Sequence, residues 1–355
     1  MPPLCNIGID MRKRTRAQAV RPVIDTPGMQ TPRSDDLILP EAGSAGAMAD
    51  LHVHSCYSHD VPNLPDFSPR ALYARAVALG MGFFTLTDHD TLDGIEALQA
   101  ELTKEFGGQP PIPVIPGVEL KVRDPQVGHT IHVNVLGLDR RQMQALVARS
   151  MSVEHFVAYC RAEGLFHAYN HPFWFERGER PNLTAIDRLV ALFPVIELNA
   201  GRIQELNSRT VAMARRHGKP VIATSDTHTG QLGKSFTLAS GETAAAFLAE
   251  ILAGRGKPFP THIDFRSFLW EVSQTVDLFF RGAPLPRGER VLPSWSGRAS
   301  RLLGRLIESR TLHRTRVSRR GMAALLKVSA RAPAYYFIRQ QRRMLPRLAT
   351  TARDA

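Results

Sequence analysis

The fold of this chain is decided by the stretch Asp50-Leu-His-Val-His-Ser-Cys-Tyr-Ser-His-Asp60. His52 and His54 are separated by one residue, and because side chains alternate between the faces of a strand, both point to the same side. Two imidazoles on one face can bind a single metal ion without distortion of the backbone. A lone His-x-His pair is a weak signal, so the rest of the chain must supply further ligands.

Further candidate ligands stand where apolar runs end. Thr87-Asp-His-Asp90, Gly117-Val-Glu119 and Ser225-Asp-Thr-His228 each close such a run. Imidazole and carboxylate groups suit zinc, manganese or iron, and a carboxylate can bridge two ions. Together the candidates are too many for one ion, so they predict two or three divalent metals and a hydrolase. The candidate metal ligands are His52, His54, His59, His89, Glu119, His132, His171, Asp226 and His228.

Seven short apolar runs carry these motifs. Most are rich in Val, Ile, Leu or Phe and are closed by Gly, Pro, Asn or Asp, as buried strands are. Their alternation with helical stretches predicts an α/β, barrel-like fold with its chemistry at the carboxyl ends of the strands. The predicted strands span residues 49–53, 82–86, 114–120, 130–136, 165–169, 194–198 and 220–224.

The stretches between these runs predict helices. Ser68 followed by Pro69 starts one that ends near Gly80, and Asp139 is positioned to cap a long helix that continues through Cys160. The other expected helices span residues 182–192, 203–217, 242–254 and 261–280.

His132 lies near the start of its run rather than at the end. If strand 130–136 runs antiparallel to strand 114–120, the beginning of the second strand lies beside Glu119, and one shared site results. His129 and His132 cannot both face inward, because an odd offset places them on opposite faces of a strand. His132 shares a face with the polar Asn134, and we choose it as the ligand.

The order His-x-His, Thr-Asp-His, Gly-x-Glu, His, His-Pro and Asp-x-His resembles the PHP family, the polymerase and histidinol phosphatase superfamily. The resemblance covers about residues 48–230 and is greatest to the small stand-alone phosphoesterases of that family. It implies a distorted seven-stranded (β/α)7 barrel that holds three divalent metals.

The resemblance also implies a ligand set for each metal. The first metal would take His52, His54, Glu119 and Asp226, the second Glu119 as a bridge with His132 and His171, and the third His59, His89 and His228. The chain departs from the family at one position, where many members have Asp-Gly after Tyr-Ser and this chain has His59-Asp60. The spacing from His54 favours His59 as the ligand, and Asp60 is the alternative.

Other polar residues are expected to support the ligands. Asp88, Asp90 and Glu197 are interpreted as groups that orient the ligating imidazoles without touching a metal. Glu197 could instead pair with Arg202. Arg202 follows a predicted strand and could bind a substrate phosphate with two parallel hydrogen bonds, or be an ordinary surface arginine. We expect Glu119, Asp226 and Arg202 to be essential for catalysis.

Charge divides the chain into two parts. Residues 1–280 hold 27 Lys and Arg against 30 Asp and Glu, whereas residues 281–355 hold 18 against 3. We therefore expect a disordered segment at 1–47, a metal-dependent hydrolase domain at 48–235 with a helical completion at 236–280, and a basic helical tail at 281–355. On this division, residues 48–280 would suffice for hydrolysis.

The tail has three interpretations. Residues 281–300 resemble a linker, and Leu302, Leu303, Leu306 and Ile307 share one helical face. The arginines around the apolar faces suit an anionic membrane surface or nucleic acid, or the tail could simply pack on the barrel. We expect a cytoplasmic protein, since there is no apolar run of spanning length, no secretory signal, and only three cysteines at unrelated spacings.

These features predict a metal-dependent phosphoesterase. Divalent ions lower the pKa of bound water, so that a metal-bound hydroxide is available as the nucleophile at pH 7. The substrate would be a phosphorylated small molecule or a nucleotide or oligonucleotide phosphate ester. The alternatives are a metal-dependent hydrolase of C–N or ester bonds, and a non-enzymatic scaffold whose basic tail binds nucleic acid or an anionic membrane.

Overall fold

The computed structural model describes residues 46–176, 178–179, 182–280 and 315–351. Its largest sheet has five strands in the order β4-β5-β6-β7-β8. The first three strands pair antiparallel, and β6, β7 and β8 are parallel. The predicted antiparallel return of strand 130–136 beside strand 114–120 is therefore confirmed. The strands are β4 (Gly117–Val122), β5 (Ile131–Leu136), β6 (Phe166–Tyr169), β7 (Val195–Asn199) and β8 (Val221–Thr224).

Two smaller sheets complete the strand structure of the described residues. One pairs β2 (Phe84–Thr85) with β3 (Val114–Ile115) in parallel, and the other places β9 (Phe236–Ala239) between β1 (Ala47–Ala49) and β10 (Lys257–Phe259). Isolated bridges join Val53 to Thr227 and His89 to Glu119. The seven-stranded (β/α)7 barrel is not confirmed, since the described strands form three separate sheets.

Three details of the strands differ from the prediction. The strand expected at 49–53 is observed at 47–49, so it begins within the segment expected to be disordered, and Val53 forms only an isolated bridge. Pro116, which has no backbone N–H for a strand ladder, separates β3 from β4 within the single run expected at 114–120. Strands β9 and β10 were not predicted, because residues 236–280 were expected to be helical. β9 pairs antiparallel with β1, and β10 pairs antiparallel with β9.

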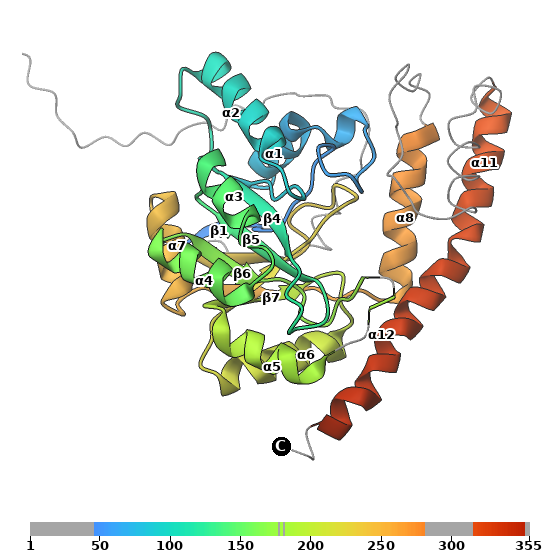
Figure 1. Ribbon diagram of the computed structural model, residues 1–355. Helices are drawn as coiled ribbons and strands as arrows, with labels where there is room; N and C mark the ends of the chain where they lie inside the picture. Colours follow the sequence, from blue (N-terminus) through green and yellow to red (C-terminus); the bar gives the residue numbers. More distant parts are fainter. Residues whose placement is uncertain (1–45, 177, 180–181, 281–314, 352–355) are drawn as a thin grey trace, which may run out of the picture.

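Helices cover the outside of the sheets (Figure 1). α1 (Pro69–Ala78) follows a 3-10 turn, η2 (Pro65–Phe67), and begins where Ser68 Oγ accepts a hydrogen bond from the N–H of Ala71. α2 (Asp93–Phe106) ends at Gly107, which has a left-handed backbone with φ of 61°. α5 (Leu183–Leu192), α6 (Gln204–Arg216) and α7 (Ala244–Leu252) match three predicted helices.

The long helix expected from Asp139 to Cys160 is two helices. Asp139 caps α3 (Arg140–Val147) through a capping box with Gln142. The backbone of Ser152 is extended, and its side chain caps α4 (Val153–Ala162). Ser152 therefore starts a second helix within the run that was expected to be one helix. Helical periodicity alone does not show where such a second helix begins.

The C-terminal helices pack on the body of the protein. In Figure 1, α8 (Phe265–Phe280) and α11 (Arg316–Ser329) stand side by side, and α12 (Arg331–Thr351) continues past α6. Lys327 forms an ion pair with Asp277, and Leu326 packs with Phe279 in a cluster that includes Phe67. The linker and helix expected at 281–314 lie outside the described residues. No helix among the described residues is long and apolar enough to cross a membrane.

Candidate metal centre

Four predicted ligands converge at one point. His52 Nε2 and His54 Nε2 lie 3.0 Å apart. Both atoms lie 3.3–3.4 Å from Glu119 Oε2 and 3.2–3.3 Å from Asp226 Oδ1. The His-x-His motif, the middle of β4 and the loop after β8 therefore supply one cluster of two nitrogen and two oxygen atoms.

The spacing of these four donors fits a metal ion. A tetrahedral site with metal–ligand distances of about 2.0–2.2 Å places neighbouring donors about 3.3–3.6 Å apart. The observed separations lie within a few tenths of an ångström of that range. Asp226 Oδ1 is buried and makes no hydrogen bond with the described residues. A buried cluster of carboxylate oxygens and imidazole nitrogens at this spacing fits a divalent metal.

The two imidazoles are held through their Nδ1 atoms, with their Nε2 atoms toward the cluster. His52 Nδ1 lies 2.6 Å from Glu197 Oε1, and since a carboxylate accepts hydrogen bonds, the ring proton is on Nδ1. His54 Nδ1 lies 3.0 Å from Ser58 Oγ. Thr224 donates a second hydrogen bond to Glu197 Oε1. Glu197 thus orients His52, as its position at the end of a predicted strand suggested.

Glu119 faces a second group of ligands with its other oxygen. Glu119 Oε1 lies 3.1 Å from His132 Nδ1 and 3.3 Å from His171 Nε2. It also accepts a hydrogen bond from Asn170 Nδ2 at 2.9 Å. The tilted ring of Trp174 lies beside both imidazoles. One carboxylate therefore separates two sets of histidines, which is the arrangement of a bridging ligand.

A third group lies on the other side of His54. Asp60 Oδ2 lies 3.1 Å from His89 Nε2 and 3.0 Å from His228 Nε2. His228 Nδ1 donates to the carbonyl oxygen of Asp226, which leaves its Nε2 toward Asp60. The side chain of His59 is exposed, and its ring centroid lies 5.0 Å from that of His89. In the structure, Asp60 therefore lies between His89 and His228, whereas the side chain of His59 is exposed to solvent.

Backbone strain is concentrated at this centre. Asp90, His171 and Asp226 are the described non-glycine residues with positive φ, at 56°, 27° and 49°. Such conformations are unfavourable for residues with a side chain and persist where the surrounding structure imposes them, commonly at functional sites. Each of the three lies at or next to a predicted ligand, so the strain fits a role in aiming ligand side chains.

Histidines lower the pKa of two carboxylates of the centre, Glu119 and Asp226. Burial alone would raise the pKa of Glu119, but His52, His89 and His132 outweigh it and hold the pKa well below its usual range. The pKa of Asp226 is likewise lowered, because neighbouring histidines overcome the effect of burial. Anionic oxygens surrounded by imidazole nitrogens are a donor set that divalent transition metals prefer.

Arg202 brings a buried cation close to the ligands. Its side chain is only 7% exposed, and its Nε has no hydrogen-bond partner in the described part of the chain. Burial lowers the pKa of Arg202 to about 10, while Asp226 and Glu197 act in the opposite direction, so the group is still protonated at pH 7. The interpretation of Arg202 as an ordinary surface arginine does not fit, because the side chain is buried, and phosphate binding by Arg202 stays a prediction.

Two predicted supporting residues differ from expectation. Asp88 accepts hydrogen bonds from the backbone N–H and the hydroxyl of Ser55, so it holds the loop of the first motif rather than an imidazole. Asp90 is exposed and accepts a long hydrogen bond from the N–H of Lys121. Asn170 and Ser58, which both contact ligands, were missed because nothing in their spacing marks them.

Comparisons with known proteins find a family and several relatives of this chain. A family model for the PHP domain matches residues 50–251. A 5'-3' exoribonuclease of Haemophilus influenzae is 39% identical over 92 residues, which cover 26% of this chain and 29% of that relative. The match thus spans less than a third of the relative's length.

Three solved structures are similar in shape. PsfC from Pseudomonas syringae is 19% identical, with a TM-score of 0.47 over 61% of this chain and 92% of that chain. A protein of Bifidobacterium adolescentis, provisionally named a metal-dependent phosphoesterase, has a TM-score of 0.41 at 17% identity over 62% and 98%. An amidohydrolase of Chromobacterium violaceum has a TM-score of 0.39 at 18% identity over 59% and 97%. Because the family model covers more than half of the sequence, this chain belongs to the PHP domain family.

Proposed function

We propose that this protein is a metal-dependent phosphoesterase. The observation that carries the proposal is the convergence of carboxylates and imidazoles on Glu119, together with the buried cation Arg202, which interacts electrostatically with Asp226 and Glu197. A phosphoryl group is anionic, so a site that binds it needs fixed positive charge beside its metals. Hydrolysis of C–N or ester bonds has less need of a buried arginine.

We propose three ligand groups. They differ from the set implied by the family resemblance at one position, where Asp60 replaces His59, because Asp60 Oδ2 lies between two histidines. The groups are His52, His54, Glu119 and Asp226; Glu119, His132 and His171; and Asp60, His89 and His228.

Each protein group has a defined task in this proposal. When bound, divalent metals would act as Lewis acids on phosphoryl oxygens and lower the pKa of a water molecule. Glu197 keeps His52 in the tautomer that presents Nε2. Asn199 donates to Asp226 Oδ2 and keeps that carboxylate in place. Arg202 binds the phosphoryl oxygens and favours the negative charge that develops on them.

The proposed substrate is a nucleotide or oligonucleotide phosphate ester. It is supported by the similarity to an exoribonuclease, which spans a quarter of this chain. A small phosphomonoester is the alternative, because the same metals and arginine would serve it.

The proposed function is tested by measuring the metal content of the protein and its activity on a panel of substrates. After removal of metals and reconstitution with Zn²⁺, Mn²⁺ or Fe²⁺, we expect two to three ions per chain and hydrolysis that a chelator abolishes. The panel holds p-nitrophenyl phosphate, 5'-phosphorylated oligoribonucleotides, histidinol phosphate, an aryl ester and an amide. Less than one metal per chain, or hydrolysis of the amide or the ester alone, would overturn the proposal.

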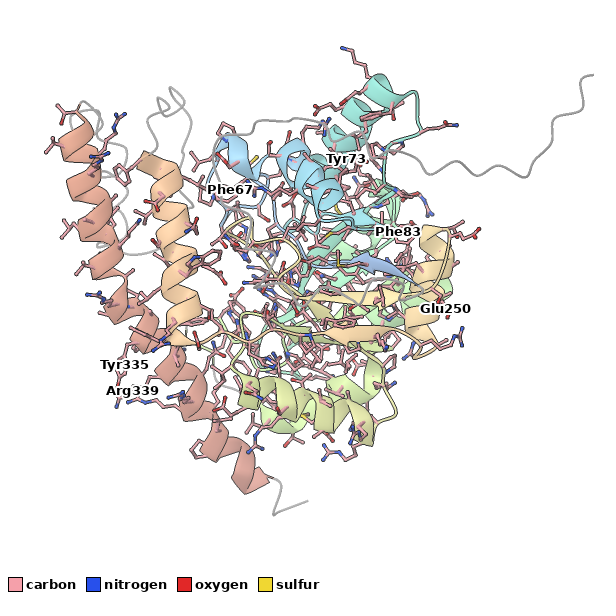
Figure 2. The ribbon with its side chains drawn as sticks, turned by 180° about the vertical axis from the view of Figure 1, so that it is seen from behind. Phe67, Tyr73, Phe83, Glu250, Tyr335 and Arg339 are labelled. Atoms are coloured by element: carbon pink, nitrogen blue, oxygen red, sulfur yellow. The ribbon has the colours of Figure 1, made fainter. Side chains whose placement is uncertain are left out.

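We also propose that the outer face of α11 and α12 binds an anionic lipid surface. Residues 316–351 contain nine Lys and Arg and no Asp or Glu. Val317, Leu325 and Val328 are 82%, 59% and 56% exposed, and Figure 2 shows Tyr335 and Arg339 on the side of α12 that faces away from the body. Exposed aliphatic side chains flanked by arginines suit insertion between lipid headgroups better than contact with nucleic acid.

Vesicle flotation tests this surface. We expect the protein to float with vesicles of phosphatidylserine and phosphatidylcholine but not with phosphatidylcholine alone, and to bind less as salt rises. Leu325→Glu should remove binding, whereas Leu252→Glu on α7, another exposed leucine, should not. Salt-sensitive binding to RNA without binding to vesicles would instead identify nucleic acid as the partner.

A further inference from the structure

A glutamine lies on the buried face of the last described helix. In α12, Ala334, Ile338 and Gln341 are buried and follow one another at intervals of four and three residues, which places them on one face. Gln340, which directly precedes Gln341, is exposed. Gln341 is only 2% exposed, and burial of an amide is unfavourable unless its hydrogen bonds are satisfied.

The side-chain amide of Gln341 forms its hydrogen bonds with the two residues that flank Arg202. Its Oε1 accepts a hydrogen bond from the N–H of Ile203 at 3.0 Å, and its Nε2 donates to the carbonyl oxygen of Gly201 at 3.1 Å. The side chain thus holds the backbone on both sides of the arginine. These contacts join residues that are about 140 positions apart in sequence.

The same loop is connected to a metal ligand. The N–H of Gly201 donates to Asn199 Oδ1 at 2.7 Å, and Asn199 Nδ2 donates to Asp226 Oδ2 at 2.9 Å. A continuous chain of hydrogen bonds therefore runs from Gln341 through Gly201 and Asn199 to Asp226. These bonds link the loop of Arg202 to the carboxylate of Asp226.

A second residue of α12 contacts the arginine itself. The Phe337 ring centroid lies 5.8 Å from Arg202 Cζ, within the range of a cation–π contact, and Phe337 also packs against Phe268 of α8. In the described part of the chain, no carboxylate lies within ion-pair distance of the guanidinium. The aromatic ring is therefore a neighbour that restricts the guanidinium without neutralising its charge.

We propose that Gln341 and Phe337 of α12 are positioning residues for Arg202, so that the C-terminal helix is part of the anion-binding site. Gln341 fixes the backbone of the arginine, and Phe337 supports its guanidinium. The inference rests on the proposed function for the identity of the anion as a phosphoryl group. The contacts of α12 with the loop of Arg202 do not depend on which reaction the protein catalyses.

Binding of inorganic phosphate to the metal-loaded protein tests this inference. Gln341→Met keeps the size of the side chain and removes both hydrogen bonds, and Gln340→Met is the matched control on the exposed face. We expect the dissociation constant of phosphate, measured by calorimetry, to rise about tenfold in Gln341→Met and to stay unchanged in Gln340→Met. Metal content should be the same in both. In an Arg202→Ala background, Gln341→Met should have no further effect on phosphate binding.

Three results would overturn the inference: wild-type protein that binds no phosphate, Gln341→Met that binds as tightly as Gln340→Met, or equal losses with and without Arg202. If Gln341→Met fails to fold, Phe337→Leu, which keeps apolar packing, must weaken phosphate binding at unchanged metal content. A protein that hydrolyses no phosphoester but shows the expected dependence on Gln341 would refute the proposed function alone.

Discussion

Glu119→Gln is expected to reduce phosphoester hydrolysis at least about a thousandfold and to lower the metal content of the purified protein. Oxygen Oε2 lies 3.0–3.4 Å from nitrogens of His52, His54 and His89, and Oε1 faces His132 and His171. An amide has the same shape, but it carries no charge and presents an NH2 group on one side. Loss of several kcal/mol of charge stabilisation at bound metals corresponds to a loss of this size.

The matched control is Glu105→Gln, an exposed glutamate of α2 that pairs with Arg70. It should retain wild-type turnover and metal content, because exposed ion pairs contribute little. Circular dichroism should show both variants folded, since glutamine has the same size and shape as glutamate. Wild-type turnover in Glu119→Gln would refute the assignment of the bridging ligand.

Much of the centre could be predicted because strands impose simple rules. Period-two alternation places His52 and His54 on one face, and the carboxyl ends of parallel strands meet at one edge, where Asp226 follows β8. His132 could be placed only by assuming an antiparallel return, which the pairing of β4 with β5 confirms. These inferences depend on local periodicity and on pairing between neighbouring strands.

Loops and distant contacts could not be predicted in this way. The segment after His54 turns, with the N–H of Ser58 bonded to the carbonyl oxygen of Ser55, so alternation no longer says whether residue 59 or 60 faces inward. The contacts of Gln341 with the Arg202 loop are tertiary, and no local pattern contains them.

Deletion of residues 281–355 is expected to destabilise the protein strongly, contrary to the expectation from sequence that residues 48–280 suffice. Leu326 and Ile338 are both buried against the body. Burial of two such side chains stabilises by about 3–6 kcal/mol, which is comparable with the total stability of many domains. The truncated chain would also lose the hydrogen bonds that hold the Arg202 loop. We expect aggregation or a much lower melting temperature, measured by circular dichroism, and loss of hydrolysis.

Point variants test whether the packing of α11 against the body contributes to the stability of the protein. Leu326→Ala should lower the free energy of unfolding by about 2–5 kcal/mol, because it leaves a cavity between α11 and α8. Leu325→Ala, one residue away and mostly exposed, should change it by less than about 0.5 kcal/mol. If chain 48–280 is as stable and as active as the full chain, and Leu326→Ala matches Leu325→Ala, then α11 and α12 are a separate unit. Arg202 must in that case be positioned by the sheet and its loops without help from α12.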